Sequence, residues 1–117
     1  MTDPRIQGLI DTLRSFARDR DWEPFHSPKN LAIALSVEAG ELLEHFQWLT
    51  AEQSAHLSEL ELAKVRLELA DVFLYLLRLS DRLGVDLIAA AFEKIDINAK
   101  KYPVALAKGT AKKYTEL

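Results

Sequence analysis

The sequence predicts an all-α protein: a bundle of four to five helices forming a single domain over residues 1–117. Apolar residues recur every three or four positions over long stretches, which is the period of an amphipathic helix. Residues suited to cap a helix N-terminus stand just before these stretches, at Asp3, Ser27, Thr50, Ser58 and Asp86. A chain of 117 residues is long enough for one modest core.

Composition excludes several classes of function. The formal net charge is −3, so the chain lacks the basic surface that binds a nucleic-acid backbone. Cysteine is absent, which removes disulfides, thiolate nucleophiles and cysteine-based metal sites. No apolar run approaches the roughly 20 residues that cross a bilayer, and no secretory signal is visible. We therefore expect a cytoplasmic protein that binds neither nucleic acid nor membrane.

The first predicted helix begins at Pro4, directly after a capping aspartate, and fades in the charged run 18–21. The next segment, 22–26, cannot be a regular helix because a proline stands in its middle. It carries Trp22 and Phe25, which are costly to leave in water. These aromatic residues either pin the loop to the core or contribute to a binding site.

The second predicted helix begins at Pro28 and places a carboxylate in an apolar stripe. Projected at ~100° per residue, Glu38 falls in the middle of the stripe and Glu41 at its edge. The stripe consists of Leu31, Ala34, Leu35, Leu42, Phe46 and Leu49. A carboxylate in such a stripe must be paired, protonated or bound to a cation, because an unpaired buried charge is very unfavourable.

After a short turn at Thr50, a long third helix is predicted from Ser58 to about Leu83, and its cross-section is unusual. Apolar residues cover most of its circumference, leaving a narrow polar strip of Lys64, Glu68, Asp71, Tyr75, Arg78 and Arg82. A helix this apolar must be surrounded on several sides. The rest of a 117-residue chain can hardly surround it, so we expect other subunits to do so.

The fourth predicted helix runs from about Leu87 to Tyr102 and places Lys94, Asn98 and Lys101 on one face. These residues could form a solvated basic stripe. They could instead hold phosphates, if the face lies opposite carboxylates that bind a metal ion. The tail, 104–117, is predicted to be loop-like.

Two acidic pairs carry the chemistry, Glu38 with Glu41 and Glu68 with Asp71. The spacing of each pair, i and i+3, projects both carboxylates from one helix face. Four oxygen donors on two facing helices suit one magnesium ion or two, with manganese as the alternative and zinc disfavoured. A ferritin-like di-iron site is excluded because it requires Glu-x-x-His, and no serine stands in a nucleophile elbow.

The sequence resembles the all-α, MazG-like nucleoside triphosphate pyrophosphatases, and within them most closely the dCTP pyrophosphatase branch. The family signature is Glu-x-x-Glu, a spacer, then Glu-x-x-Asp, and the resemblance covers nearly the whole chain. The other matching stretches are Arg20-Asp21-Trp22-Glu23, Phe25-His26, Gly40-Glu41-Leu42, Phe46-Gln47-Trp48, Tyr75-Leu76, Val85-Asp86-Leu87, Lys94, Asp96, Asn98, Tyr102-Pro103 and Lys113-Tyr114-Thr115.

This resemblance implies a magnesium-dependent hydrolase that splits a nucleoside triphosphate, with dCTP or 5-modified dCTP favoured, into the monophosphate and pyrophosphate. It implies that Glu38, Glu41, Glu68 and Asp71 are catalytic and hold the metal ion. The residues it places on the substrate are Trp22, His26, Trp48, Tyr75, Lys94, Asn98, Lys101 and Tyr102. Family members are commonly tetramers, which agrees with the apolar third helix.

Two other classes of function stay open at this point. The chain could be a non-catalytic helical oligomer that senses a nucleotide, or a bundle that binds a protein partner and no ligand. The intact set of four carboxylates argues against both, because nothing structural requires a glutamate within an apolar stripe.

Overall fold

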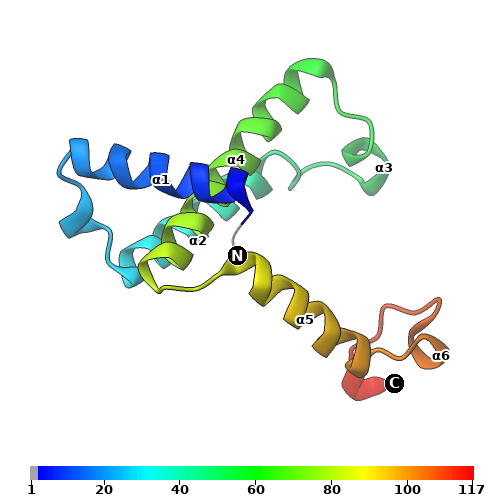
Figure 1. The fold of residues 1–117 in the computed structure, drawn as a ribbon. Helices are drawn as coiled ribbons and strands as arrows, with labels where there is room; N and C mark the ends of the chain where they lie inside the picture. Colours follow the sequence, from blue (N-terminus) through cyan, green and yellow to red (C-terminus); the bar gives the residue numbers. More distant parts are fainter. Residues whose placement is uncertain (1–2) are drawn as a thin grey trace. The chain divides into compact units, whose positions relative to one another are not determined.

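The computed structural model describes residues 3–117, which form six α-helices and two short 3₁₀ helices and contain no strand (Figure 1). The elements are α1 Pro4–Asp19, η1 Glu23–Phe25, α2 Pro28–Glu44, α3 Ala51–Ser54, α4 Glu59–Arg82, α5 Leu87–Lys101, α6 Val104–Ala107 and η2 Tyr114–Glu116. The all-α prediction is confirmed. Within the described residues, no helix is at once long enough and apolar enough to cross a membrane.

The chain divides into two compact units, Met1–Val85 and Asp86–Leu117. The first unit contains α1 to α4 and therefore both acidic pairs. The second contains α5, α6 and η2, with the predicted basic stripe on α5. A single domain over the whole chain stays a prediction.

The predicted caps form, which explains why the helices begin where they do. Asp3 accepts a hydrogen bond from the Arg5 backbone N–H at 2.8 Å. Thr50 and Gln53 form a reciprocal capping box, with hydrogen bonds of 2.9 and 3.1 Å. The remaining predicted caps, Ser27, Ser58 and Asp86, each accept from the backbone N–H three residues later. Each cap satisfies a donor that the helix itself leaves unpaired.

In the first unit, α2 lies along α4 and α1 packs against α4. The buried apolar residues come from all three helices: Ala17 on α1, Leu31 on α2, and Val65 and Leu77 on α4. Burying a large apolar side chain contributes about 1.5–3 kcal/mol. The packing of α2 along α4 determines where the carboxylates meet.

Many large apolar side chains of α2 and α4 remain exposed in the single chain. On α4, Leu62, Leu69 and Phe73 are spaced so that they share one face, and all three are exposed. The other exposed large apolar side chains of the two helices are Ile33, Val37, Leu43, Leu60 and Leu67. The third predicted helix is thus as apolar as expected, but the other helices of the first unit do not cover it.

Two boundaries differ from the sequence analysis. The second predicted helix carries an apolar stripe to Leu49, whereas α2 ends at Glu44. There the hydrogen bonds shift toward i→i−3, with His45 N–H donating to Leu42 and Phe46 N–H to Leu43, ahead of the Thr50 cap. The tail was expected to be loop-like, but it contains α6 and η2.

An ion pair links α1 to the C-terminal end of α4. Asp81 on α4 accepts two hydrogen bonds from the Arg14 guanidinium on α1, one of them 2.8 Å from Nε. The hydrogen bonds from Arg14 lower the pKa of Asp81 below its ordinary value, and the positive charges of Arg14, Arg78 and Arg82 add to the effect. The Asp81 side chain is 11% exposed, so solvent screens this pair only in part.

Replacing Asp81 with asparagine should destabilise the fold by about 1–3 kcal/mol at neutral pH, because a charged hydrogen-bond acceptor is lost. Since the folded pKa is depressed, the stabilisation by Asp81 is present above its unfolded pKa and is lost as pH falls through the folded pKa. Urea unfolding at pH 7 and pH 3 measures both. Asp19→Asn, on the last turn of α1, is the control. A penalty that did not shrink in acid would contradict the ion-pair explanation.

Candidate active site

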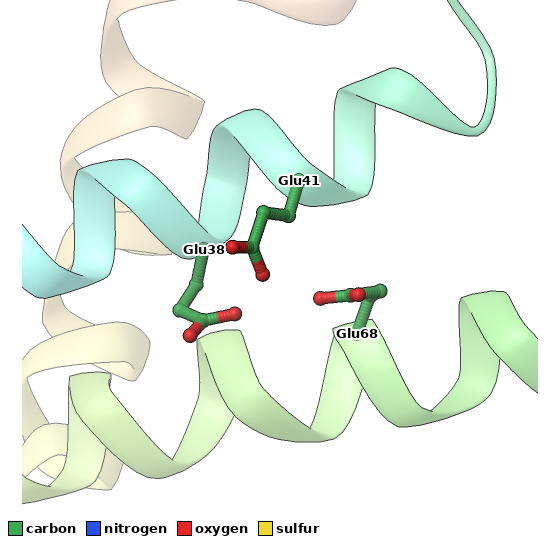
Figure 2. Close-up of side chains that lie close together, drawn as sticks. All are labelled: Glu38, Glu41 and Glu68. Carbon is green, nitrogen blue, oxygen red and sulfur yellow. The ribbon is translucent and has the colours of Figure 1, made fainter.

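Three of the four predicted carboxylates meet between α2 and α4. Figure 2 shows Glu38 and Glu41 projecting from α2 toward Glu68 on α4. One carboxylate oxygen from each of these residues lies within 4.8 Å of the other two. We call these three residues the glutamate cluster. The i, i+3 spacing on α2 and the packing of α2 along α4 together account for it.

The carboxylates of the glutamate cluster are held close together at an unfavourable electrostatic cost. Glu38 Oε2 and Glu68 Oε2 are buried, and no hydrogen bond within the described residues satisfies them. Burial, a hydrogen bond shared with Glu41 and the charges of Glu41, Asp71 and Glu68 raise the pKa of Glu38 to about 7. Carboxylates held this close need a proton or a cation between them.

The cluster fits a hard divalent cation. Its donors are all carboxylate oxygens, the ligands that magnesium and manganese prefer, and two of those oxygens have no hydrogen-bond partner. Asp71, the fourth predicted ligand, is exposed and lies outside the group of three, although its charge still acts on Glu38. His45 Nε2 lies 3.9 Å from Glu68 Oε1, so an imidazole borders the site as well.

The turn after α1 positions Trp22. Asp21 adopts a left-handed conformation, with φ of 54°, which aspartate tolerates better than most residues. The Trp22 N–H then donates to the Ala17 carbonyl at 2.9 Å, and the Asp21 N–H donates to Arg18 at 3.1 Å. This pattern closes the helix as a Schellman motif does. It places the indole edge-on to the Phe16 ring, with ring centroids 5.7 Å apart.

Trp22 opens onto a cavity of about 430 Å³ between α1, the 22–26 segment and α4. We call it the aromatic cavity. Three residues predicted to contact substrate line it, namely Trp22, His26 and Tyr75, and so does Asp71 of the second acidic pair. The remaining lining residues are Leu9, Thr12, Leu13, Phe16, Ala17, Leu74 and Arg78. The cavity is therefore mostly apolar with a few polar groups, as small-molecule sites usually are.

The remaining predicted substrate residues lie elsewhere in the chain. Trp48 follows α2 in the turn before α3, is 86% exposed and does not line the aromatic cavity. Lys94, Asn98 and Lys101 are on α5 in the second unit, and Tyr102 caps its C-terminus. Within that unit, the Lys101 Nζ lies 4.9 Å from the centre of the Tyr114 ring, and Tyr102 packs edge-on to Tyr114.

Sequence reasoning missed Arg78 as a residue of the site. Its side chain is buried, lines the aromatic cavity and contacts His26. The available signal was its place in the narrow polar strip of α4, three residues before Asp81. That spacing allows an ion pair along the helix, and a paired arginine can be buried. What could not be foreseen is that the 22–26 segment folds onto it.

Comparison with known proteins identifies the family of this chain. Residues 33–117 match the model of the MazG-like family. The chain is 44% identical to human dCTP pyrophosphatase 1 over 117 residues, which cover 98% of this chain and 69% of the human protein. It is 42% identical to the bovine dCTP pyrophosphatase 1 over 118 residues, which cover 99% of this chain and 70% of the bovine protein.

A solved structure is similar as well. The crystal structure of a pyrophosphatase from Archaeoglobus fulgidus superimposes with a TM-score of 0.81 at 38% identity, covering 88% of this chain and 96% of that one. The family match spans α4 and α5, most of α2 and all four predicted carboxylates. On this evidence the chain belongs to the MazG-like family.

Proposed function

We propose that this chain hydrolyses a deoxynucleoside triphosphate, dCTP or a 5-modified dCTP, to the monophosphate and pyrophosphate. The proposal rests mainly on the position of Asp71. It lines the aromatic cavity, and its charge acts on Glu38 in the glutamate cluster. A base in the cavity would therefore have its phosphates near the carboxylates. The relatives named dCTP pyrophosphatase 1 support cytosine as the base.

In this proposal Glu38, Glu41 and Glu68, together with Asp71, hold a magnesium ion. Bound magnesium supplies charge neutralisation of the phosphates and a lower pKa for a bound water. The carboxylates would hold the cation beside the phosphate chain, and one glutamate would accept the proton of the attacking water. Manganese, which prefers similar oxygen ligands, is the alternative ion.

The base is proposed to stack on Trp22, with Tyr75 and His26 beside it in the aromatic cavity. Stacking on an aromatic ring contributes about 1–3 kcal/mol per base and tolerates any base, because every base has a π-face. Discrimination between bases must therefore come from hydrogen bonds to the base edge. His26 is the candidate among the lining residues, since its ring can donate or accept.

Some roles rest on the sequence pattern and the family resemblance. These are the base contact of Trp48 and the phosphate contacts of Lys94, Asn98 and Lys101, with Tyr102 next to them. A single functional domain over residues 1–117 and a cytoplasmic location are predicted from chain length and sequence composition. All of them stay predictions.

A pyrophosphate-release screen against the common nucleoside triphosphates with magnesium tests the function. dCTP should give the highest kcat/KM among the four common deoxynucleotides, and pyrophosphate should be the first product. Orthophosphate as first product would place cleavage at the γ-phosphate instead. No turnover of any nucleotide, combined with tight binding, would favour a sensor.

Variants tested in the same screen distinguish residues that contribute affinity for any base from residues that discriminate between bases. Trp48→Ala should raise KM for every base accepted, by roughly tenfold if stacking is lost. His26→Ala should reduce the differences in kcat/KM between bases, because it removes a group that can form a hydrogen bond to the base edge. An unchanged KM for dCTP in Trp48→Ala would mean that this indole serves packing and not the base.

We also propose that the chain is a homo-oligomer, with a tetramer expected and a dimer the minimum. The support is the exposed apolar face of α4 formed by Leu62, Leu69 and Phe73, because exposed apolar patches mark interaction surfaces. Light scattering at micromolar concentration should give a tetramer or dimer. Leu62→Glu should shift the population to smaller species, whereas Lys64→Glu, also exposed on α4, should not. A wild-type monomer would contradict this proposal.

A further inference from the structure

His26 accepts a hydrogen bond from Arg78 that has no role in the proposed function. The Nε of Arg78 lies 3.2 Å from Nδ1 of His26, 52 residues apart in the chain. Arg78 is itself buried, with only 5% of its surface exposed. Both side chains line the aromatic cavity. A partly buried hydrogen bond between distant segments restricts the orientation of the histidine ring.

The Arg78 guanidinium is in turn held from its other side. Its Nη1 lies 3.5 Å from Oδ2 of Asp81, and Asp81 is held by the two hydrogen bonds from Arg14. The planar fork of arginine can reach two partners at once, which the single ammonium of a lysine does less well. The sequence of contacts is therefore Arg14, Asp81, Arg78 and His26, running from α1 through α4 to the 22–26 segment.

The direction of the last hydrogen bond determines where the proton of His26 resides. A guanidinium has donors only, so Nδ1 of His26 must accept. A neutral imidazole that accepts at Nδ1 carries its hydrogen at Nε2. Burial and the positive charges of Arg78 and Arg82 also lower the pKa of His26, which favours the neutral ring. The other edge of the ring is thus left with a single N–H donor.

We propose that Arg78 is a positioning residue that holds His26 as the Nε2–H tautomer, so that the aromatic cavity selects a base that accepts a hydrogen bond at N3. This inference rests on the proposed function, because it assumes that a base occupies the cavity. Both cytosine and thymine present an acceptor at O2, but N3 is an acceptor in cytosine and a donor in thymine. A fixed N–H donor that faces N3 therefore favours dCTP over dTTP.

The tautomer can be measured without any substrate. Long-range ¹H–¹⁵N NMR of the full chain labelled at histidine distinguishes a protonated nitrogen from an unprotonated one, and His26→Ala assigns the signal among the three histidines. We expect His26 to show an unprotonated Nδ1 and a protonated Nε2. Arg78→Met should give a mixture of tautomers, and Arg78→Lys, which keeps a donor, should restore part of the wild-type pattern. A protonated Nδ1 in the wild-type protein would overturn the proposal, even if no variant folds.

Kinetics test the consequence for the base. Arg78→Met should reduce the ratio of kcat/KM for dCTP over dTTP by about tenfold, because a misaligned donor no longer discriminates. Arg82→Met is the matched control: it removes the next arginine of α4, whose charge acts on His26 without a hydrogen bond. It should leave the ratio unchanged.

The two readouts separate this proposal from the function on which it rests. An unchanged ratio in Arg78→Met overturns the proposal while dCTP hydrolysis stands. Absence of turnover in the wild-type protein would instead overturn the proposed function, and the selection of base with it. The NMR result would then still decide the positioning of His26 by Arg78.

Discussion

Glu41→Gln should lower kcat for dCTP hydrolysis by ~10²-fold or more, the scale of losing one preorganised electrostatic group. The Glu41 carboxylate lies within 4.8 Å of the carboxylates of Glu38 and Glu68. A glutamine there keeps the shape of the side chain but removes a charged ligand. Asp71→Asn should have a similar effect, since Asp71 joins the aromatic cavity to the glutamate cluster. Steady-state kinetics with saturating magnesium measure both.

Glu44→Gln is the matched control for this experiment. Glu44 lies one turn after Glu41 at the end of α2, is exposed and is outside the glutamate cluster. It should retain near-wild-type turnover. Thermal unfolding should show that Glu41→Gln and Asp71→Asn are folded. Near-wild-type kcat for both site variants would disprove the assignment of these carboxylates as metal ligands.

Magnesium should raise the melting temperature of the wild-type protein, and Glu38→Gln should remove most of that effect. A ligand at 100 times its Kd stabilises the folded state by about 2.7 kcal/mol, which corresponds to roughly 10 °C for a chain of this size. Without metal, the order of the two melting temperatures should reverse. Glu38→Gln should then melt above the wild type, because it replaces a buried carboxylate oxygen that has no hydrogen-bond partner.

Differential scanning fluorimetry with EDTA, with magnesium and with manganese measures these shifts. The Glu44→Gln variant should respond to the metal like the wild type. A magnesium shift of equal size in wild type and Glu38→Gln would show that the ion binds elsewhere. A metal-free Glu38→Gln protein that melts below the wild type would show that the carboxylate has a stabilising partner after all.

Several features of the fold could be predicted from local sequence because their causes are local. Each predicted cap lies within three residues of the N–H that it accepts from, as with Thr50 and Gln53. The period of apolar residues predicted the extent of α1, α4 and α5 within a few residues. The end of α2 was less well predicted, because the stripe continues to Leu49 in a turn that is not helical.

The grouping of the carboxylates was predicted in part for the same reason. The spacing within each acidic pair, together with the position of Glu38 in an apolar stripe, indicated carboxylates on one buried face. Periodicity cannot tell how far one helix slides along another. Only the packing of α2 on α4 decided that Glu68, and not Asp71, joins Glu38 and Glu41.

The sequence by itself therefore determined the helices, their caps and the chemical character of the site, all of which depend on neighbours a few residues apart. The tertiary structure decided what depends on long-range contacts. It brought the 22–26 segment over α4, 52 residues away, so that Trp22, His26 and Tyr75 line one cavity while Trp48 stays outside it. It also placed Arg78 against His26. Such contacts depend on burial summed over three helices, which no local pattern records.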